Sequence, residues 1–433
     1  MKRKLSAIEC MIDGNIVYMV RLEGSFQEDR LRSALSRVQR KHPALRMLIR
    51  KERDGLYYEE GCAPDVPLRI VPRMAEDDYQ RESYVELRKV FVEDQPLLRA
   101  VWLQSEFESD LLLVTSHRIC DGMSMLTIVR EVLRALHNDE ELVPYEPISA
   151  KVMIGDYQPQ HPWKRKLMAS LLNGVLRLIP GSSSVSENNE YALEWSVGPS
   201  LTEALKLRCK AEGVSVHAAL VVALDRSLLK IVGKKKLPGW IEGPMDARRG
   251  RLAALKSDML FFGGGSLKMR TGQALEEEFW ARGRAVNEDI RRMVDQEMLD
   301  IPGRYYFNEL LRPVSNGRIQ TMVRLGDALH VNGSWNRLAL SNLGNVVVND
   351  SDAPFRLKDL RLYVHSFNFR LLGLVAYALN GEMRFYYVGD EKCLSRAQAN
   401  ALKQEFMALL QRQVEPPHGD AKDFPLVAAA VAQ

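Results

Sequence analysis

The chain has 433 residues, of which 46% are hydrophobic and 27% are charged, so it is long enough for one large or two medium soluble domains. Its 60 Lys and Arg against 56 Asp and Glu leave a formal charge of +4 with the signs interleaved, whereas nucleic-acid-binding proteins concentrate basic residues on one face. This distribution of charge predicts a protein that binds no nucleic acid. The five cysteines are scattered and no pair has the spacing of zinc ligands, which predicts a reduced, cytoplasmic protein that binds no metal.

The first 150 residues alternate between strand-like and helix-like patterns. Residues 28–41 predict an amphipathic helix, because their apolar positions fall at three- and four-residue intervals before Pro43. From Gly122 onward, one wide apolar face predicts a second helix. The predicted strands of this half are residues 16–22, 100–103 and 111–115, together with a hairpin over 47–59 around Asp54-Gly55.

A change of composition marks a boundary near the middle of the chain. Residues 156–190 hold three prolines and the run Gly181-Ser182-Ser183-Ser184, which are signals of a linker. We therefore predict an N-terminal lobe over 1–160, a linker or crossover over 161–190 and a C-terminal lobe over 191–433.

The predicted linker contains a short basic and apolar helix. Lys164-Arg165-Lys166 precede the apolar residues 167–179, and no stretch of the chain reaches the roughly 18 consecutive apolar residues of a spanning helix. One interpretation is a surface crossover helix that packs its leucine face on the fold. The other is an interfacial helix over 164–179 whose cations meet anionic headgroups, giving the protein peripheral contact with a membrane.

The second half repeats the alternation of strands and helices. Helices are predicted at 199–212, from 214 to about 231 and at 395–413, and the tail after Pro416 is expected to be poorly ordered. Alternation in both halves predicts the α/β class with two lobes of similar build. The predicted strands of this half are residues 191–197, 240–244, 346–348, 362–369, 374–379 and 384–388.

The segment with the clearest chemistry joins the strand 111–115 to the helix that begins at Gly122. A histidine at a strand end, here His117, can be held by the backbone with its ring in a cleft, and an ordinary pKa of about 6.5 suits a general base. Asp121 needs a cationic partner if it points into the fold. Gly122 leaves room for a thin substrate arm to pass close to the backbone.

These residues alone leave alternatives open. A His-x-x-x-Asp pair followed by glycine also arises by chance in a chain of this length. Metal ligation by His117 and Asp121 lacks a third ligand nearby. Cys120 lies in the same loop, but the adjacent Asp121 does not favour a thiolate nucleophile.

The segment Ser116 to Gly122 resembles the His-His-x-x-x-Asp-Gly signature of the CoA-dependent acyltransferase superfamily. That superfamily includes peptide-synthetase condensation domains, polyketide-associated acyltransferases and chloramphenicol acetyltransferase. Five further segments resemble family segments in the expected order along both halves, in addition to the opening residues 5–9. They are Lys41-His42-Pro43-Ala44-Leu45-Arg46, the helix start at 213–216, Gly243-Pro244-Met245-Asp246-Ala247-Arg248, Ser341-Asn342-Leu343-Gly344 and residues 379–383.

The resemblance implies a fold and a place for the substrates. It implies two chloramphenicol-acetyltransferase-like lobes that form a V with an active-site tunnel between them. Gly122 matches the glycine beside the channel for the pantetheine arm. Ser341 and Asn342 match a loop that approaches the tunnel where the lobes meet.

The resemblance also implies roles within the motif. His117 matches the second, catalytic histidine. Asp121 matches an aspartate that forms a structural ion pair with an arginine, for which Arg248 is the matching candidate. Ser116 stands in place of the first histidine, a supporting position, and this departure makes a standard peptide-synthetase condensation domain a less close match.

The function implied is that of an acyltransferase with His117 as general base, transferring acyl groups other than amino-acyl groups. The donor would be acyl-CoA or an acyl-phosphopantetheine on a carrier protein, the acceptor an alcohol or amine, and the favoured product an ester, with no cofactor bound. A stand-alone amide-forming condensation enzyme is the alternative. A catalytically silent binding protein on the same fold is an alternative of another class.

Overall fold

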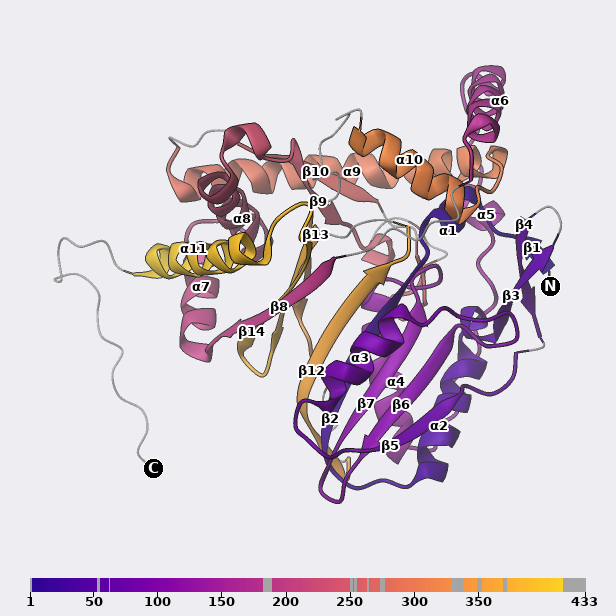
Figure 1. Ribbon diagram of the computed structural model, residues 1–433, viewed down its shortest axis with the longest axis horizontal. Helices are drawn as coiled ribbons and strands as arrows, with labels where there is room; N and C mark the ends of the chain where they lie inside the picture. The colour runs from indigo at the N-terminus through magenta and orange to yellow at the C-terminus, as the bar shows by residue number, and fades with distance from the viewer. Residues whose placement is uncertain are drawn as a thin grey trace.

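The computed structural model describes most of the chain. The described residues are 2–52, 55–61, 63–181, 189–249, 252, 255–262, 265–272, 277–328, 338–348, 353–368 and 372–415. Within them the strands build two large sheets, of five and six strands, and a small sheet of three (Figure 1).

The five-stranded sheet forms the lower part of Figure 1, and its strand order is β12-β2-β7-β6-β5. Its strands β2, β7 and β6 are antiparallel neighbours, and β5 adds a parallel edge. The strands are β2 (Gly14–Gly24), β5 (Leu68–Pro72), β6 (Leu98–Gln104), β7 (Glu108–Ser116) and β12 (Phe355–Ser366).

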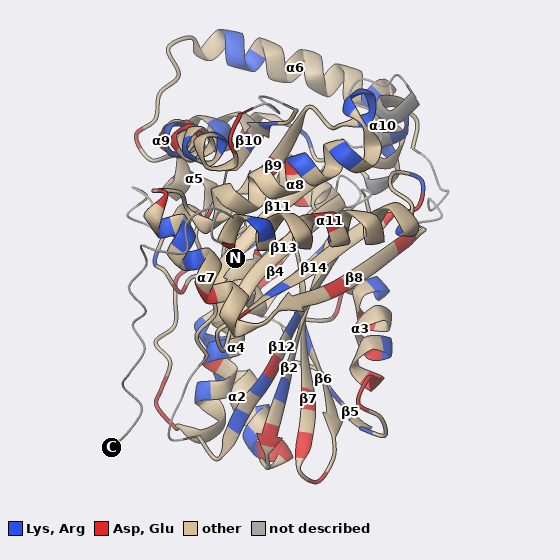
Figure 2. Cartoon of the chain, turned by 90° about the vertical axis from the view of Figure 1, so that its left-hand side faces the viewer, with Lys and Arg blue, Asp and Glu red and all other residues tan. Residues whose placement is uncertain are grey.

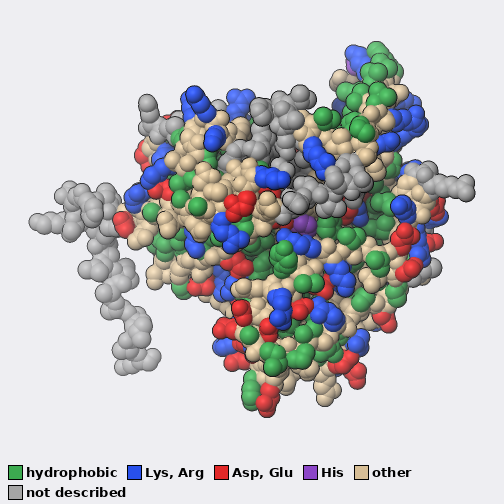
Figure 3. Space-filling model, in the orientation of Figure 1, with side chains coloured by type: hydrophobic (Ala, Val, Ile, Leu, Met, Phe, Trp, Pro, Cys, Tyr) green, Lys and Arg blue, Asp and Glu red, His purple; other side chains and the backbone are tan. Residues whose placement is uncertain are grey.

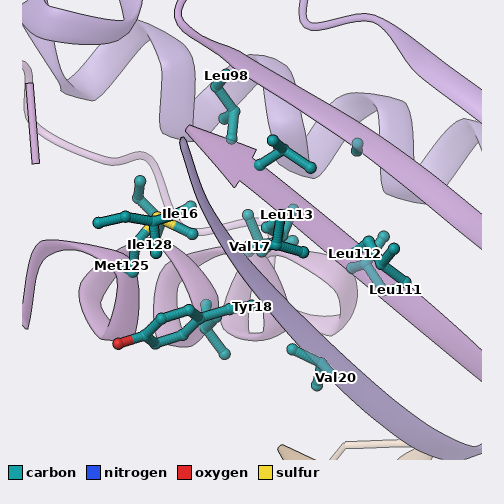
Figure 4. Packing of buried hydrophobic residues seen from close by; sticks show 14 of the residues in the cluster. Ile16, Val17, Tyr18, Val20, Leu98, Leu111, Leu112, Leu113, Met125 and Ile128 are labelled. Atoms are coloured by element: carbon teal, nitrogen blue, oxygen red, sulfur yellow. The ribbon is translucent and has the colours of Figure 1, made fainter. Parts of the chain in front are cut away.

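Helices cover both faces of this sheet because side chains alternate along each strand. On one face of β2, Asn15 donates to the Glu86 carbonyl of α3 (Asp78–Arg88) at 3.1 Å. On the other face, Ile16 and Tyr18 lie beside Met125 and Ile128 of α4 (Gly122–His137), as Figure 4 shows. Helix α2 (Glu28–Lys41) packs against α4 and completes this layer.

The six-stranded sheet has the order β10-β9-β11-β13-β14-β8. Four long helices pack with it around a second buried cluster: α7 (Pro199–Ala211), α8 (Val216–Val232), α9 (Phe279–Leu310) and α11 (Arg396–Val414). The strands are β8 (Glu190–Val197), β9 (Trp240–Pro244), β10 (Ser266–Arg270), β11 (Leu338–Asn345), β13 (Leu372–Leu379) and β14 (Glu382–Asp390).

The smaller elements lie in the right-hand half of Figure 1. The three-stranded sheet has the order β1-β4-β3, helices α1, α5 and α6 contact α9, and α10 contacts α1. Their bounds are β1 (Lys2–Lys4), β3 (Met47–Glu52), β4 (Gly55–Glu60), α1 (Ala7–Met11), α5 (Ala150–Ile154), α6 (Pro162–Leu178) and α10 (Asn316–Ala328).

Most of the predicted elements are present, and the α/β class is confirmed. The predicted strand at 346–348 is wrong, because β11 ends at Asn345 and the following residues are irregular. Helix α9 was not predicted, since its buried residues gather at its start and then recur only near Met298 and Ile301, which leaves no continuous apolar face. Asp54, residues 182–188 and the tail from Pro416 lie outside the described residues.

Strand β12 belongs to the second half of the chain in sequence and to the first sheet in space. It lies within the range 191–433, yet it pairs antiparallel with β2 along the whole edge of the five-stranded sheet. The second half of the chain therefore supplies a strand to the first sheet, while the proposed boundary at 161–190 stays a prediction.

Candidate active site

His117 follows directly on β7, a central strand whose residues from Ser109 to Ser116 are buried. Ser116, the last residue of β7, donates its backbone N–H to Leu97 O at 3.2 Å. His117 donates its own N–H to Gly14 O at 2.9 Å, where β2 begins. The backbone of the histidine is therefore anchored to the strands on both sides.

The ring of His117 is held in one tautomer. Its Nδ1 lies 2.8 Å from Cys120 O, and because a carbonyl oxygen only accepts, Nδ1 carries the proton and Nε2 keeps its lone pair. The edge of the ring meets Phe262, with ring centroids 5.2 Å apart. Burial lowers the pKa of His117 below its ordinary value, so the imidazole is neutral at pH 7.

The predicted ion pair between Asp121 and Arg248 is present. The Arg248 Nη2 donates to both carboxylate oxygens of Asp121, at 2.7 and 2.6 Å. Burial opposes the charge of this guanidinium, but the carboxylates of Asp121 and Asp246 outweigh burial and raise the pKa of Arg248. Asp121 also caps α4, because its Oδ1 accepts from the backbone N–H of Ser124 at 2.8 Å.

Ser124 and Phe262 are parts of this site that the sequence did not reveal. The fully buried hydroxyl of Ser124 accepts from Arg248 Nη1 at 2.9 Å and from Phe261 N at 3.0 Å. This network ties the segment that carries Phe262 to the first turn of α4. The Asp-x-x-Ser spacing is a capping signal, but nothing local indicates a partner 137 residues away.

The motif glycine contacts the other half of the chain. A Cβ at Gly122 would lie 3.1 Å from a methyl group of Leu343 and 3.2 Å from the hydroxyl of Tyr18. Tyr18 uses that hydroxyl to donate to Gly122 O at 2.9 Å. Leu343 therefore fills the space beside Gly122, and the predicted pantetheine channel there requires its side chain to turn away.

Ser341 and Asn342 precede Leu343 on β11 and are half-buried. They pair with Val375 and Ala376 of β13, and Asn342 Oδ1 accepts from Gly344 N at 3.0 Å. The segment thus reaches the motif through Leu343, whereas roles for Ser341 and Asn342 in a tunnel stay a prediction.

Cys120, His42 and His365 have partners within the fold, and His217 is largely buried. Burial raises the pKa of the Cys120 thiol to about 12, so it is protonated at neutral pH. His42 Nε2 lies 2.6 Å from Glu131 Oε2, and His365 Nδ1 lies 2.7 Å from Glu190 Oε2. Burial lowers the pKa of His217 to about 4.

A cavity of about 130 Å³ opens beside the histidine turn. Arg118, Ile119 and Phe262, the neighbours of His117, line it from one side. Tyr305, Asn308 and Glu309, from the last turns of α9, line it from the other. No three metal-ligating side chains gather anywhere in the described part of the chain.

Residues 15–238 match the family model of the condensation domain, which is just over half of the chain. The chain belongs to the condensation-domain family. This match contains the whole of β7, the His117 turn and α4.

Two curated relatives are synthases far longer than this chain. A plipastatin synthase polypeptide of Bacillus subtilis (strain 168) is 24% identical over 253 residues, which cover 54% of this chain and 10% of that protein. Chondramide synthase cmdD of Chondromyces crocatus is 32% identical over 135 residues, covering 28% of this chain and 4% of that protein. The condensation-domain protein described here thus spans a small part of the length of either relative.

Solved structures share its fold over nearly the whole chain. Polyketide synthase associated protein 5 from Mycobacterium tuberculosis matches with a TM-score of 0.64 at 12% identity, covering 95% of this chain and 98% of that one. Trichothecene 15-O-acetyltransferase from Fusarium sporotrichioides matches with a TM-score of 0.64 at 10% identity, covering 95% of both chains. The first condensation domain of the CDA synthetase matches with a TM-score of 0.66 at 14% identity, covering 97% of both. The predicted superfamily and its chloramphenicol-acetyltransferase-like α/β fold are confirmed.

Proposed function

We propose that this condensation-domain protein is an acyltransferase that moves an acyl group from a CoA or carrier-protein thioester to a hydroxyl group, with His117 as the general base. The observation that carries the proposal is the free lone pair on Nε2, which follows from the hydrogen bond of Nδ1 to Cys120 O. The lowered pKa keeps the ring neutral, the state in which a histidine accepts a proton.

In the proposed reaction the acceptor oxygen attacks the thioester carbonyl carbon while Nε2 of His117 takes the hydroxyl proton. The bond between the carbonyl carbon and sulfur then breaks, and the departing sulfur takes the proton from Nε2. The products are an ester and a free thiol, and His117 ends neutral. The edge contact of Phe262 and the bond to Cys120 O hold the ring in place through both steps.

A hydroxyl acceptor suits this base. A neutral amine is nucleophilic without help, whereas a hydroxyl is a weak nucleophile until a base removes its proton. The O-acetyltransferase among the similar structures, which by its name acylates an oxygen, supports the same choice. Condensation domains work on carrier-bound acyl groups, which supports a carrier protein or CoA as the source of the thioester.

The test is thiol release from acyl-CoA and from acyl-carrier protein in the presence of a panel of alcohols and amines, with the product identified by mass. We expect acceptor-dependent release by the native protein, and a loss of about 10²- to 10⁴-fold in His117→Ala. His161→Ala, at the exposed histidine that precedes α6 and whose side chain makes no capping hydrogen bond, is the matched control and should react like the native protein.

Equal rates for the native protein and His117→Ala across the panel would overturn the role of the histidine. Amide products alone would overturn the hydroxyl acceptor and leave the base in place. Donor binding without turnover by the native protein would assign the chain to binding rather than catalysis.

A further inference from the structure

Helix α6 exposes its apolar side chains to solvent. Fourteen of its 17 residues are exposed, and seven of these are large and apolar. Figure 2 shows the helix running along the top of the molecule with no other element beyond it. The exposed apolar residues are Trp163 (62%), Leu167, Met168, Leu171 (64%), Leu172, Val175 and Leu178 (84%).

The apolar stripe points away from the body of the protein. Trp163, Leu167 and Leu171 are spaced by four residues, so they lie on one side of the helix. The buried residues Ala169 and Leu176 lie on the opposite side, where Leu176 packs in a small cluster with residues of the α9–α10 region. Leucines that would normally face a core therefore face solvent here.

The charges on α6 are all positive. Lys164, Arg165 and Lys166 lie near its start, Arg177 lies in its last turn, and residues 162–178 contain no Asp or Glu. In Figure 2 no part of the helix carries the red of Asp or Glu, and Figure 3 shows basic and apolar atoms together at the upper right corner of the molecule. A second copy of α6 would bring cations against cations, so this surface complements an anionic partner instead.

We propose that α6 docks this protein on the surface of an anionic lipid membrane, with the apolar stripe in the acyl boundary and the cations at the headgroups. At about 1.5 Å per residue, 17 residues give a helix shorter than the roughly 30 Å hydrocarbon core, so it lies in the plane of the surface. Lys164, 5.5 Å from the ring of Trp163, extends its cation at the edge of the stripe, where headgroups begin.

Docking at α6 would also place the membrane near the end of α9 that lines the cavity beside the His117 turn. Asn173 of α6 donates to Leu310 O at 3.1 Å and accepts from Arg312 N at 2.8 Å, at the end of α9. The residues of α9 that line the cavity, Tyr305, Asn308 and Glu309, directly precede this junction. If the proposed acyl transfer holds, the substrate class that this arrangement favours is an acyl chain or alcohol carried by a lipid.

The experiment is co-sedimentation of the full chain with vesicles of phosphatidylcholine alone and of phosphatidylcholine with phosphatidylglycerol. We expect binding to the anionic vesicles. The triple change Lys164→Gln, Arg165→Gln and Lys166→Gln should weaken it by about 10- to 100-fold, and Leu171→Glu by about tenfold or more.

Two matched controls separate α6 from general charge or hydrophobicity. Lys234, Lys235 and Lys236, three exposed lysines after α8, receive the same triple change to Gln. Phe107, 73% exposed in the turn between β6 and β7, is changed to Glu. Both control variants should bind the anionic vesicles like the native protein.

Absence of native binding to anionic vesicles, or equal binding by the α6 variants and the native protein, would overturn the proposal. A lipid-free dimer that Leu171→Glu converts to a monomer would overturn it too, by assigning the stripe to a second copy. The binding assay involves no acyl transfer, so its outcome is independent of the His117→Ala result.

Discussion

The turn from Ser116 to Gly122 and helix α6 are both exceptions to the rule that polar side chains are exposed and apolar side chains are buried, each in the opposite sense. The turn and its partners bury charged and polar groups, including Arg248, whose side chain is 2% exposed. Helix α6 exposes seven large apolar ones. Buried polar groups and exposed apolar surfaces are the two departures that carry information about function.

The difference between them lies in whether the unusual groups have partners within the chain. Around the turn, Asp121, Ser124 and Arg248 satisfy one another in a closed network. Such a network fixes positions, which a general base requires. On α6 the apolar stripe has no covering element among the described residues, so its stabilisation must come from something outside them.

The largest expected effect comes from disrupting the buried network around Asp121. Asp121→Asn removes the charge that compensates Arg248, leaving a buried guanidinium with Asp246 as its remaining ionic partner, and should lower the free energy of unfolding by about 3 kcal/mol. Urea unfolding measures it, with Asp139→Asn as a control because that carboxylate is 77% exposed in its ion pair with Arg30. An unchanged midpoint combined with lost thiol release would show that Asp121 acts in the chemistry and not through the fold.

A smaller effect concerns the charge state of His117. Because burial lowers its pKa below 6.5, thiol release should be constant through neutral pH and fall about tenfold per pH unit only below the lowered pKa. Between the folded and unfolded pKa values the unfolded chain binds more protons, so the stability due to neutral His117 is complete above pH 6.5 and declines as the pH falls. A rate profile from pH 5 to 8 with its inflection above about 6.5 would contradict a buried neutral base.

The smallest expected effect tests the exposed side. Leu171→Glu removes no internal contact of consequence, because this side chain is 64% exposed, and it should change the free energy of unfolding by less than about 0.5 kcal/mol. Leu176→Ala, on the buried side of the same helix, provides the contrast and should destabilise measurably. Thermal melts of both variants measure these changes in stability. A large loss of stability in Leu171→Glu would mean that the apolar stripe is covered within the folded chain.

Prediction from sequence succeeded where local patterns decide the structure. The strand before His117 and the helix after Gly122 follow from their apolar periods, and Asp121 caps that helix as its residue type favours. The pairing of Asp121 with Arg248 came from the family resemblance, since no local pattern links residues 127 positions apart.

What could not be predicted depends on contacts between distant segments. The hydroxyl of Ser124 accepts a hydrogen bond from the backbone N–H of Phe261, and the ring of His117 contacts the ring of Phe262. The sequence around Phe261 and Phe262 gives no sign of either contact. A helix was predicted at 164–179 and is present as α6, but whether its leucines face the fold or the solvent depends on neighbours that the pattern of one helix does not specify.

Strand β12 has a consequence for how the protein is made. During synthesis β2 leaves the ribosome early, but its partner strand on that edge is complete roughly 340 residues later, a delay of about 20 to 70 s at ordinary elongation rates. Throughout that interval one edge of the first sheet keeps its backbone N–H and C=O groups open, as an unprotected edge on which another nascent chain can pair. A fragment that stops before Phe355 would keep that edge permanently, so expression of residues 1–354 alone should yield aggregates where the full chain folds.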